Sequence, residues 1–256
     1  MVAPPITSPD PVSLLPTNLY SDEPPMETNL HLRQMLLLIS CLDWLWRDRQ
    51  DYFAAGNLTV YYSPQKIKSR DFRGPDFFVV LGTEKRDRRS WTVWEEGGKY
   101  PNVIVEILSD STATVDRTTK KQLYQDIFRT PEYFWFDPDT LEFCGFILVG
   151  GVYEPIQPNM SGQLWSRQLE LGLGVEGGQL RFFTPNGVLV PTPAEAALQA
   201  EQTAQQAEQA VQQAEQTAQQ AEQKLQEAAQ QTQQAQDQAE RLAAKLRELG
   251  IDPDTV

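Results

Sequence analysis

Two carboxylates in or beside apolar segments suggest where this chain could do chemistry. Glu106 lies in the middle of the apolar run 103–108, and Asp76 directly precedes the apolar run 77–81. A buried carboxylate is costly unless it is paired, protonated or bound to a metal. Two carboxylates at adjacent strand positions can hold Mg²⁺, which takes one or two carboxylates together with water and substrate phosphate. The pair therefore predicts a metal site, although a Pro-Asp turn would explain Asp76 alone.

A lysine on the following helix supplies a third candidate. Helical spacing over 116–129 places Lys120 on the inward stripe, whereas Lys121 is rotated by about 100°. An inward lysine could pair with the carboxylates, orient an attacking water or stabilise phosphate charge. The alternative is a lysine that covers the helix end with its stem and extends its ammonium into solvent. The stripe consists of Asp116, Lys120, Leu123, Tyr124, Ile127 and Phe128.

The elements that position these residues follow from hydrophobic periodicity. The segment 101–108 has apolar residues on both faces, which is typical of a central strand buried on both sides. Helices are predicted at 28–46 and 116–129, the second after the capping-rich segment 109–115. Mixed strands with two substantial helices indicate an α/β or α+β domain. The other expected strands are 58–63, 77–81, 90–94, 132–136, 141–149, 152–156, 168–173 and 179–184, with a turn at 137–139 and a hairpin around 150–151.

The overall composition bounds the possibilities. The chain has 256 residues, 40% of them hydrophobic, which is ample for one sizeable core. Residues 1–25 contain seven prolines without periodicity and read as a disordered or loosely draped arm. The net charge of −13 does not suggest a nucleic-acid binder, but local patches decide. Basic clusters at 66–73 and 85–89 could form such patches, or could be ordinary solvated loops.

Cysteine usage and hydropathy favour a cytoplasmic protein without a membrane partner. Cys41 and Cys144 are expected to be reduced, although a fold that joined them could bridge them. The N-terminus lacks a basic segment followed by an apolar one, so no signal peptide is evident. The apolar stretch 35–46 is interrupted by Ser40 and Asp43 and is too short to span a bilayer.

Residues 194–249 form a heptad repeat rich in alanine, glutamine and glutamate, unlike the mixed sequence that precedes them. The heptad AEQTAQQ at 200–206 recurs with drift to LAAKLRE at 242–248, and apolar residues alternate at spacings of three and four. The two inner positions are mostly alanine, with larger residues at Leu225, Leu242, Leu246 and Leu249. This predicts a weak, self-associating coiled coil, with a lone, partly frayed helix as the alternative. The helix should end at Gly250, leaving 250–256 as a tail.

Taken in order, these motifs resemble one known group of proteins. Residues about 26–190 are similar to the Uma-two family of restriction-endonuclease-like proteins, within the PD-(D/E)XK nuclease superfamily. The resemblance covers about two-thirds of the chain, and the ordered set is more specific than its parts. The matching segments are GPDFFVV, YPNVIVEILSDST, the D-x-x-x-K-x-x-x-Y of Asp116, Lys120 and Tyr124, and EYFWFDP followed by a hairpin.

The resemblance implies a restriction-endonuclease-like mixed sheet flanked by helices and a Mg²⁺- or Mn²⁺-dependent phosphodiesterase site. It implies that Asp76 and Glu106 are metal ligands, with the carbonyl of Ile107 as a further one. The usual superfamily lysine position, two residues after the glutamate, holds Leu108 here. The resemblance therefore implies that the catalytic lysine has moved to Lys120.

The first helix and the matching motif contain three further residues of interest. Superfamily members often carry an extra acidic residue on the first helix, which suggests Glu27. Tyr124 is a second possible addition, because it belongs to the matching motif. His31 shares the helix face of Met35 and Leu38. A lone histidine on an apolar stripe is expected to be a structural core residue.

The resulting hypothesis is a PD-(D/E)XK-like nuclease domain at 26–193, followed by the heptad helix. Its function would be metal-dependent hydrolysis of DNA phosphodiester bonds. The alternative is a non-catalytic interaction or regulatory protein that keeps the nuclease fold and assembles through its coiled coil. The acidic chain and the displaced lysine favour the alternative, while the acid pair favours the enzyme.

Overall fold

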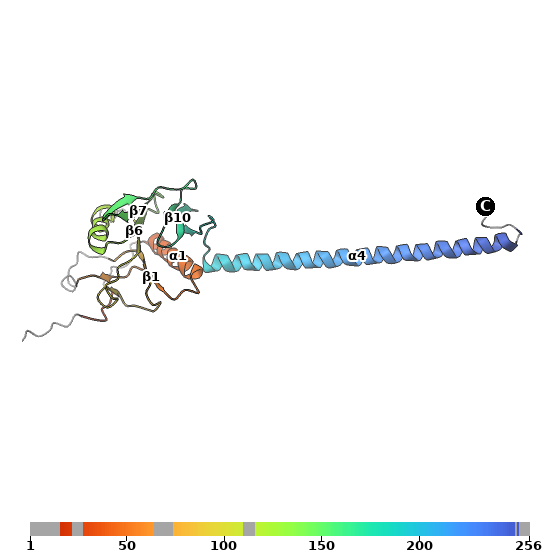
Figure 1. Cartoon of the computed structure of the whole chain (residues 1–256), viewed down its shortest axis with the longest axis horizontal. Helices are drawn as coiled ribbons and strands as arrows, with labels where there is room; N and C mark the ends of the chain where they lie inside the picture. Colours follow the sequence, from red (N-terminus) through yellow and green to blue (C-terminus); the bar gives the residue numbers. More distant parts are fainter. Residues whose placement is uncertain (1–15, 22–27, 64–73, 110–115, 249, 251–256) are drawn as a thin grey trace, which may run out of the picture. The chain divides into compact units, whose positions relative to one another are not determined.

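The structure is a computed structural model that describes residues 16–21, 28–63, 74–109, 116–248 and 250 (Figure 1). It divides into two compact units, Met1–Ala194 and Glu195–Val256. The first unit contains the mixed sheets and shorter helices, and the second contains most of one long helix.

A six-stranded mixed sheet forms the centre of the first unit. Its order is β1-β3-β5-β6-β7-β8, in which β5 and β6 are parallel and the other neighbours are antiparallel. The predicted central strand β5 lies between two partners, as its doubly apolar pattern requires. The strands are β1 (Tyr52–Gly56), β3 (Phe77–Leu81), β5 (Val103–Ile107), β6 (Glu132–Phe136), β7 (Phe143–Val149) and β8 (Val152–Pro155).

The two faces of β5 belong to two separate hydrophobic cores. Val103 and Val105 pack in the core that contains Leu38 and Leu42 of helix α1 (Asn29–Leu45). This core also contains side chains from a three-stranded sheet, whose order is β11-β10-β9. Its strands are β9 (Leu164–Ser166), β10 (Leu171–Glu176) and β11 (Gln179–Phe183).

The opposite face of β5 carries Ile104 and, just beyond the strand, Leu108. Both pack in the core that contains Tyr124 and Phe128 of the second helical segment. Trp91 of the short parallel pair β2 (Val60–Tyr61) and β4 (Trp91–Thr92) also belongs to this core. The central strand is therefore covered on both faces, and any polar side chain on it must find a partner inside the protein.

The second helical segment is mostly a π-helix. It comprises η2 (Asp116–Lys120), one α-turn α3 (Lys121–Leu123) and η3 (Tyr124–Phe128), and it ends at Arg129 in the left-handed region with φ 55°. The predicted helix at 116–129 is thus present. The expectation that Ile127 faces inward is wrong, because its side chain is 49% exposed. Hydrogen bonds from i to i+5 widen the turn, so the 3.6-residue phase does not hold along this segment.

The predicted strands agree with the structure at several places. The strand at 132–136 and the hairpin around 150–151 are confirmed, and 77–81 matches β3. Strands β1 and β9 were not predicted, and the segment 58–63 forms a strand only at β2. Cys41 and Cys144 are not joined by a disulfide.

Part of the proline-rich N-terminal segment and one basic cluster contact the domain. Asn18 donates its backbone N–H to Glu95 Oε1 at 3.0 Å.

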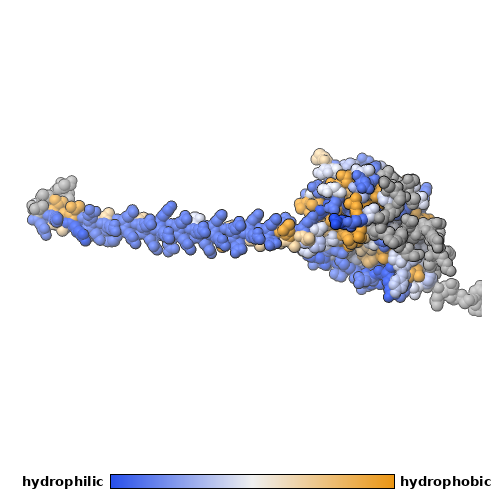
Figure 2. Space-filling model, turned by 180° about the vertical axis from the view of Figure 1, so that it is seen from behind, coloured by the Kyte–Doolittle hydropathy of each residue, from blue (hydrophilic) through white to orange (hydrophobic). Residues whose placement is uncertain are grey.

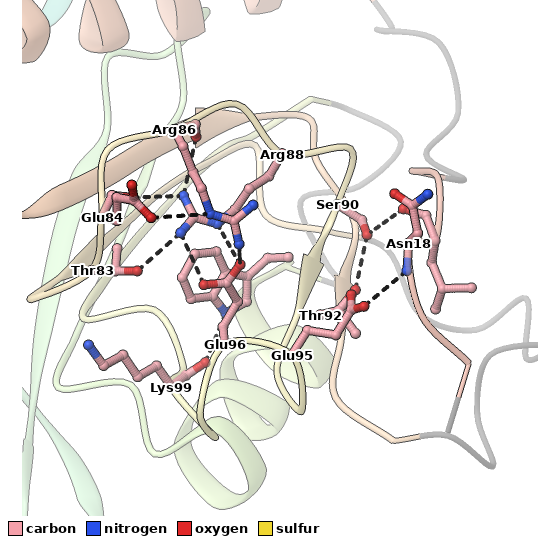
Figure 3. A network of polar contacts seen from close by, with 12 residues as sticks. Asn18, Thr83, Glu84, Arg86, Arg88, Ser90, Thr92, Glu95, Glu96 and Lys99 are labelled. Atoms are coloured by element: carbon pink, nitrogen blue, oxygen red, sulfur yellow. Dashed lines mark hydrogen bonds and ion pairs between the residues drawn. The ribbon is translucent and has the colours of Figure 1, made fainter. Parts of the chain in front are cut away.

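Arg88 binds Glu96 through two nitrogens, at 2.6 and 3.0 Å, and Arg86 contacts the same carboxylate at 2.7 Å (Figure 3). These arginines are committed to internal ion pairs, which favours a structural reading of the cluster at 85–89. The cluster at 66–73 lies outside the described residues.

The second unit consists largely of α4 (Pro193–Glu248), a 56-residue helix in which no described side chain is buried. Its visible surface is hydrophilic over most of its length, and apolar side chains gather close to its C-terminal end (Figure 2). Leu225 and Leu242 of the heptad seam are 72% and 59% exposed. Gly250 follows with φ 76°, as expected for a helix terminator. Of the helices that the structure describes, none is long and apolar enough to cross a membrane.

Candidate active site

The carboxylates of Asp76 and Glu106 meet at one end of the β3–β5 ladder. The antiparallel register pairs Phe77 with Val105, so Asp76 and Glu106 occupy the next opposed position. The backbone N–H of Asp76 donates to Glu106 Oε2 at 3.3 Å. In return, the backbone N–H of Ile107 donates to Asp76 Oδ2 at 2.8 Å. Each carboxylate therefore accepts a backbone N–H from the other residue's strand segment, and these bonds fix the pair at the end of the sheet.

Glu106 is completely buried and is compensated by side chains from the second helical segment. Its Oε2 lies 3.0 Å from Lys120 Nζ, and its Oε1 accepts a hydrogen bond from the Tyr124 hydroxyl at 2.6 Å. The Lys120 side chain is 12% exposed. An ion pair and a hydroxyl donor together offset the cost of removing this carboxylate from water. Lys120 lies at the end of η2 and Tyr124 at the start of η3, four residues on.

Asp76 receives its own partner from the opposite side of the sheet. Nε2 of His31, in the first turn of α1, lies 3.0 Å from Asp76 Oδ1. Burial favours the neutral form of Asp76, but the His31 contact and the positive charge of Lys120 outweigh it and hold the pKa of this carboxyl below its ordinary value. Asp76 is therefore a carboxylate near neutral pH, as a metal ligand must be.

Strand β1 and the residue after it fix the backbone of Asp76. Asn57, in the left-handed region with φ 47°, donates its N–H to the Asp76 carbonyl at 3.1 Å. Gly56 allows this approach, because a Cβ there would lie 2.2 Å from Met35 Sδ and 3.0 Å from the Asp76 carbonyl oxygen. Helix α1, strand β1 and the Asp76 segment therefore pack closely at this corner of the sheet.

The structure brings together most of the candidate residues from the sequence. Asp76, Glu106, Lys120 and Tyr124 form one connected cluster. Ile107 donates its N–H to Asp76, and the role of its carbonyl as a metal ligand stays a prediction. Glu27 lies outside the described residues.

The expectation that His31 is a buried core residue agrees with the structure, in which it is 7% exposed. Sequence reasoning did not place its ring against the Asp76 carboxylate, which lies 3.0 Å from His31 Nε2. The available signal was its placement one turn before Met35 on the inward face of the first helix. Nothing in the local pattern indicates that this turn of the helix lies against Asp76, since the contact joins residues 45 positions apart.

The donor set fits a hard divalent cation. Within the described ranges, no three histidine, cysteine or acidic side chains form a group that could hold a metal ion by themselves. Mg²⁺ does not require such a cage, because two carboxylates with water and a substrate phosphate satisfy it. Asp76 and Glu106 offer those two carboxylates side by side. Asp76 Oδ1 and Oδ2, which face His31 and the Ile107 N–H, each have a second lone pair for a cation, whereas Glu106 Oε2 already accepts from both Lys120 and the Asp76 N–H.

Comparisons with known proteins place the chain in a family. A family model named Uma2, described as "Putative restriction endonuclease", matches residues 14–185. A crystal structure described as that of "a putative nuclease belonging to DUF820" from Anabaena variabilis is 18% identical, with a TM-score of 0.42, and covers 59% of this chain and 80% of that chain. No curated protein matches the chain. Because the family model spans more than half of its residues, the chain belongs to the Uma2 family.

Proposed function

We propose that this protein is a Mg²⁺-dependent endonuclease, also served by Mn²⁺, that hydrolyses phosphodiester bonds in DNA. The observation that carries the proposal is the pairing of Asp76 with Glu106 at the end of β3 and β5, beside the ammonium of Lys120. Two carboxylates can hold a divalent cation that polarises a phosphate, and an ammonium beside them can offset the charge that develops. Membership of a family described as "Putative restriction endonuclease" supports the same reaction.

Each residue of the cluster has a proposed role. Asp76 and Glu106 would hold the cation, with the Ile107 carbonyl as a further ligand. When bound, the ion would supply Lewis-acid polarisation of a phosphate and acidification of a water molecule. Lys120 Nζ lies 3.0 Å from Glu106 Oε2, and its side chain is 12% exposed, so its ammonium can orient that water or offset negative charge on the phosphate.

Tyr124 has a supporting role in the proposed site. Its hydroxyl donates to Glu106 Oε1 at 2.6 Å and so fixes the plane of a carboxylate that no solvent reaches. A fixed carboxylate presents its remaining lone pairs in one direction, which lowers the reorganisation needed when a cation binds.

We further propose DNA as the partner, a cytoplasmic location and self-association through α4.

A second candidate function is a non-catalytic interaction protein that keeps this fold. The observation that favours it is that protein side chains already bind the Glu106 carboxylate, through the ion pair with Lys120 and the hydrogen bond from Tyr124. Such a set of contacts is also what a purely structural cluster would contain. The two functions differ in whether the wild-type chain binds Mn²⁺.

The test combines metal binding and cleavage on purified variants. Wild-type protein should bind Mn²⁺ and cut plasmid DNA only when Mg²⁺ or Mn²⁺ is present. Asp76→Asn and Glu106→Gln keep the shapes of the side chains but remove the ligand charges. Both variants should lose at least about 100-fold in cleavage rate while staying folded in thermal melts, which is the size of loss expected for a group essential to the chemistry.

Glu132→Gln is a matched control for these variants. Glu132 is also a fully buried carboxylate, and it pairs with Val103 at the opposite end of β5. Its variant should retain Mn²⁺ binding and cleavage. Full activity in Glu106→Gln, or equal loss in Glu132→Gln, would contradict the assignment. Absence of Mn²⁺ binding by the wild-type chain would favour the non-catalytic alternative.

A further inference from the structure

We infer that His31 is a positioning residue that orients the Asp76 carboxylate for metal binding. The inference rests on the proposed function and adds to it a residue from helix α1, on the opposite side of the sheet from Lys120 and Tyr124. It concerns the geometry of the carboxylate, and His31 itself is not assigned as a metal ligand.

The hydrogen bonds around Asp76 fix the plane of its carboxylate. Oδ2 accepts from the backbone N–H of Ile107 at 2.8 Å, and Oδ1 lies 3.0 Å from His31 Nε2. A bare imidazole lone pair facing an anionic oxygen at that distance would be repulsive, so Nε2 carries the hydrogen. Oδ2 is thus held by a donor from the sheet, and Oδ1 by a donor from the helix. The remaining lone pairs then point in fixed directions, as they must in a preorganised ligand.

Helix α1 holds the imidazole firmly. The Thr28 hydroxyl oxygen caps the helix by accepting from the backbone N–H of His31 at 3.1 Å. Three residues later, Gln34 clamps the helix to β11: its Nε2 donates to the Leu180 carbonyl at 2.9 Å, and its Oε1 accepts from the Leu180 N–H at 3.0 Å. His31 itself is 7% exposed. A donor on a capped and clamped helix gives the precise placement that a metal-binding carboxylate needs.

Gln34 serves as a control for His31, because it is expected to have a structural role on the same helix without contacting the acid pair. Both side chains are buried and polar, and they lie one turn apart. Gln34 hydrogen-bonds to main-chain groups of β11, so its removal should weaken the packing of α1. His31 contacts a side chain of the acid pair, so its removal should change how that pair binds a cation.

The experiment measures Mn²⁺ binding to the full chain by calorimetric titration, with thermal melts of the same samples. His31→Leu removes the donor and should weaken Mn²⁺ binding about 10- to 100-fold, the usual cost of losing a hydrogen bond to a metal ligand. His31→Gln places an amide N–H near the position of Nε2 and should restore binding to within a few-fold of wild type. Gln34→Leu should lower Tm while leaving the Mn²⁺ affinity unchanged.

A further variant keeps the inference testable if His31→Leu does not fold. His31→Asn preserves polarity, but its amide is too short to reach Asp76 Oδ1, so it should bind Mn²⁺ as weakly as expected for His31→Leu. Wild-type affinity in His31→Asn or His31→Leu would overturn the inference. Equal loss in His31→Gln and His31→Leu would also overturn it, because an amide donor should replace a positioning imidazole but not a ligating one.

The outcome also distinguishes the inference from the function on which it rests. If wild-type protein binds Mn²⁺, Glu106→Gln does not, and His31→Leu binds normally, the inference alone fails. If wild-type protein and Glu106→Gln are equally unable to bind Mn²⁺, the proposed function fails and the inference fails with it. Weakened binding in His31→Leu with recovery in His31→Gln supports both.

Discussion

Lys120 and Lys121 are neighbours in the sequence but have different surroundings. Lys120 Nζ lies 3.0 Å from the buried Glu106 carboxylate. Lys121 Nζ lies 3.4 Å from the centre of the Phe146 ring, and burial lowers the pKa of its ammonium. Both lysines pack against the domain through part of their side chains, yet only Lys120 reaches the acid pair. This difference allows the two residues to be compared as a functional position and its matched control.

Substitution of the two lysines should have unequal effects on cleavage. Lys120→Met removes the cation beside Glu106 and should reduce the rate of DNA cleavage by about 100-fold or more, because a charge that stabilises the transition state is lost. Lys121→Met loses only a contact with an aromatic ring and should keep most of the activity. The measurement is the initial rate of plasmid cleavage at saturating Mg²⁺ for both variants.

Stability provides the second readout for this pair. Without metal, Lys120→Met leaves a fully buried carboxylate lacking its cation, which should cost about 3–5 kcal/mol of unfolding free energy. A bound divalent cation should return part of that stability, because it replaces the missing positive charge. Stronger loss of cleavage in Lys121→Met would show that the orientation of this helical segment differs from the one described.

At the scale of single residues, the sequence predicts the acidic members of the cluster well. Glu106 is recognisable because it interrupts the apolar run 103–108, and Lys120 because it interrupts an apolar helical stripe. The contact of His31 with Asp76 depends on how α1 packs, which no local pattern encodes. The Ile107 N–H that holds Asp76 Oδ2 belongs to the backbone and has no signature in the side-chain sequence.

Among the elements, β6 and the turn after β9 are joined by a second buried carboxylate. Glu132 Oε1 accepts from the backbone N–H of Arg167 at 2.6 Å and of Gln168 at 3.2 Å, and Oε2 accepts from the Ser166 hydroxyl. Glu132 pairs with Val103 in the parallel β5–β6 ladder, so these hydrogen bonds connect the start of that ladder to the three-stranded sheet. Burial nevertheless raises the pKa of Glu132 above its ordinary value of 4.5, against the lowering effect of these donors.

The raised pKa of Glu132 predicts the direction in which its contribution to the stability of the fold changes with pH. The folded chain binds the Glu132 proton more tightly than the unfolded chain, so this contribution to stability is complete below pH 4.5 and is lost as pH rises through the folded pKa. Glu132→Gln cannot ionise and keeps an acceptor for both backbone donors. Urea unfolding at several values of pH should therefore show the variant gaining stability relative to wild type as pH increases.

Asp76 supplies an internal check on that experiment. The pKa of Asp76 is lowered from 3.8, so its contribution is lost as pH falls below that value, in a window separate from that of Glu132. Unfolding measured above pH 4.5 therefore isolates the Glu132 effect from the Asp76 effect. A stability difference between Glu132→Gln and wild type that does not change with pH would show that Glu132 keeps an ordinary pKa.

Long, strongly patterned elements were predictable, and short or irregular ones were not. The strand β6 and the hairpin of β7 and β8 have apolar runs bounded by turn residues, and their order was anticipated. Strand β9 has three residues, too few for a period to be detected. Strand β1 ends in Ala54, Ala55 and Gly56, whose small side chains give little strand signal but leave room for α1. The π-helical hydrogen bonding of η2 and η3 changes the spacing on which helix prediction rests.

The whole molecule combines two units of different chemistry. The family match ends at residue 185, before α4 begins at Pro193. Residues 194–256 carry a net charge of −7, and the rest of the chain carries −6. The heptad pattern predicted a long helix in this region, and α4 confirms it. Self-association through the exposed seam stays a prediction.

The exposed seam of α4 should mediate weak association between copies of the chain. Its alanine layers bury little area each, and burial contributes roughly 25 cal/mol per Å², so most of the stability should come from the larger seam residues. Leu225, which is 72% exposed, should therefore be sensitive: Leu225→Gln should shift the monomer–oligomer equilibrium toward monomer. Leu198 is 56% exposed and lies outside the seam, so Leu198→Gln is a matched control that should leave the equilibrium unchanged.

Sedimentation of both variants, the wild-type chain and a chain truncated after Thr192 would measure this from micromolar to millimolar concentration. If the truncated and full-length chains share one oligomeric state throughout, α4 is a solvated helix, and any dimer must form through the unit Met1–Ala194.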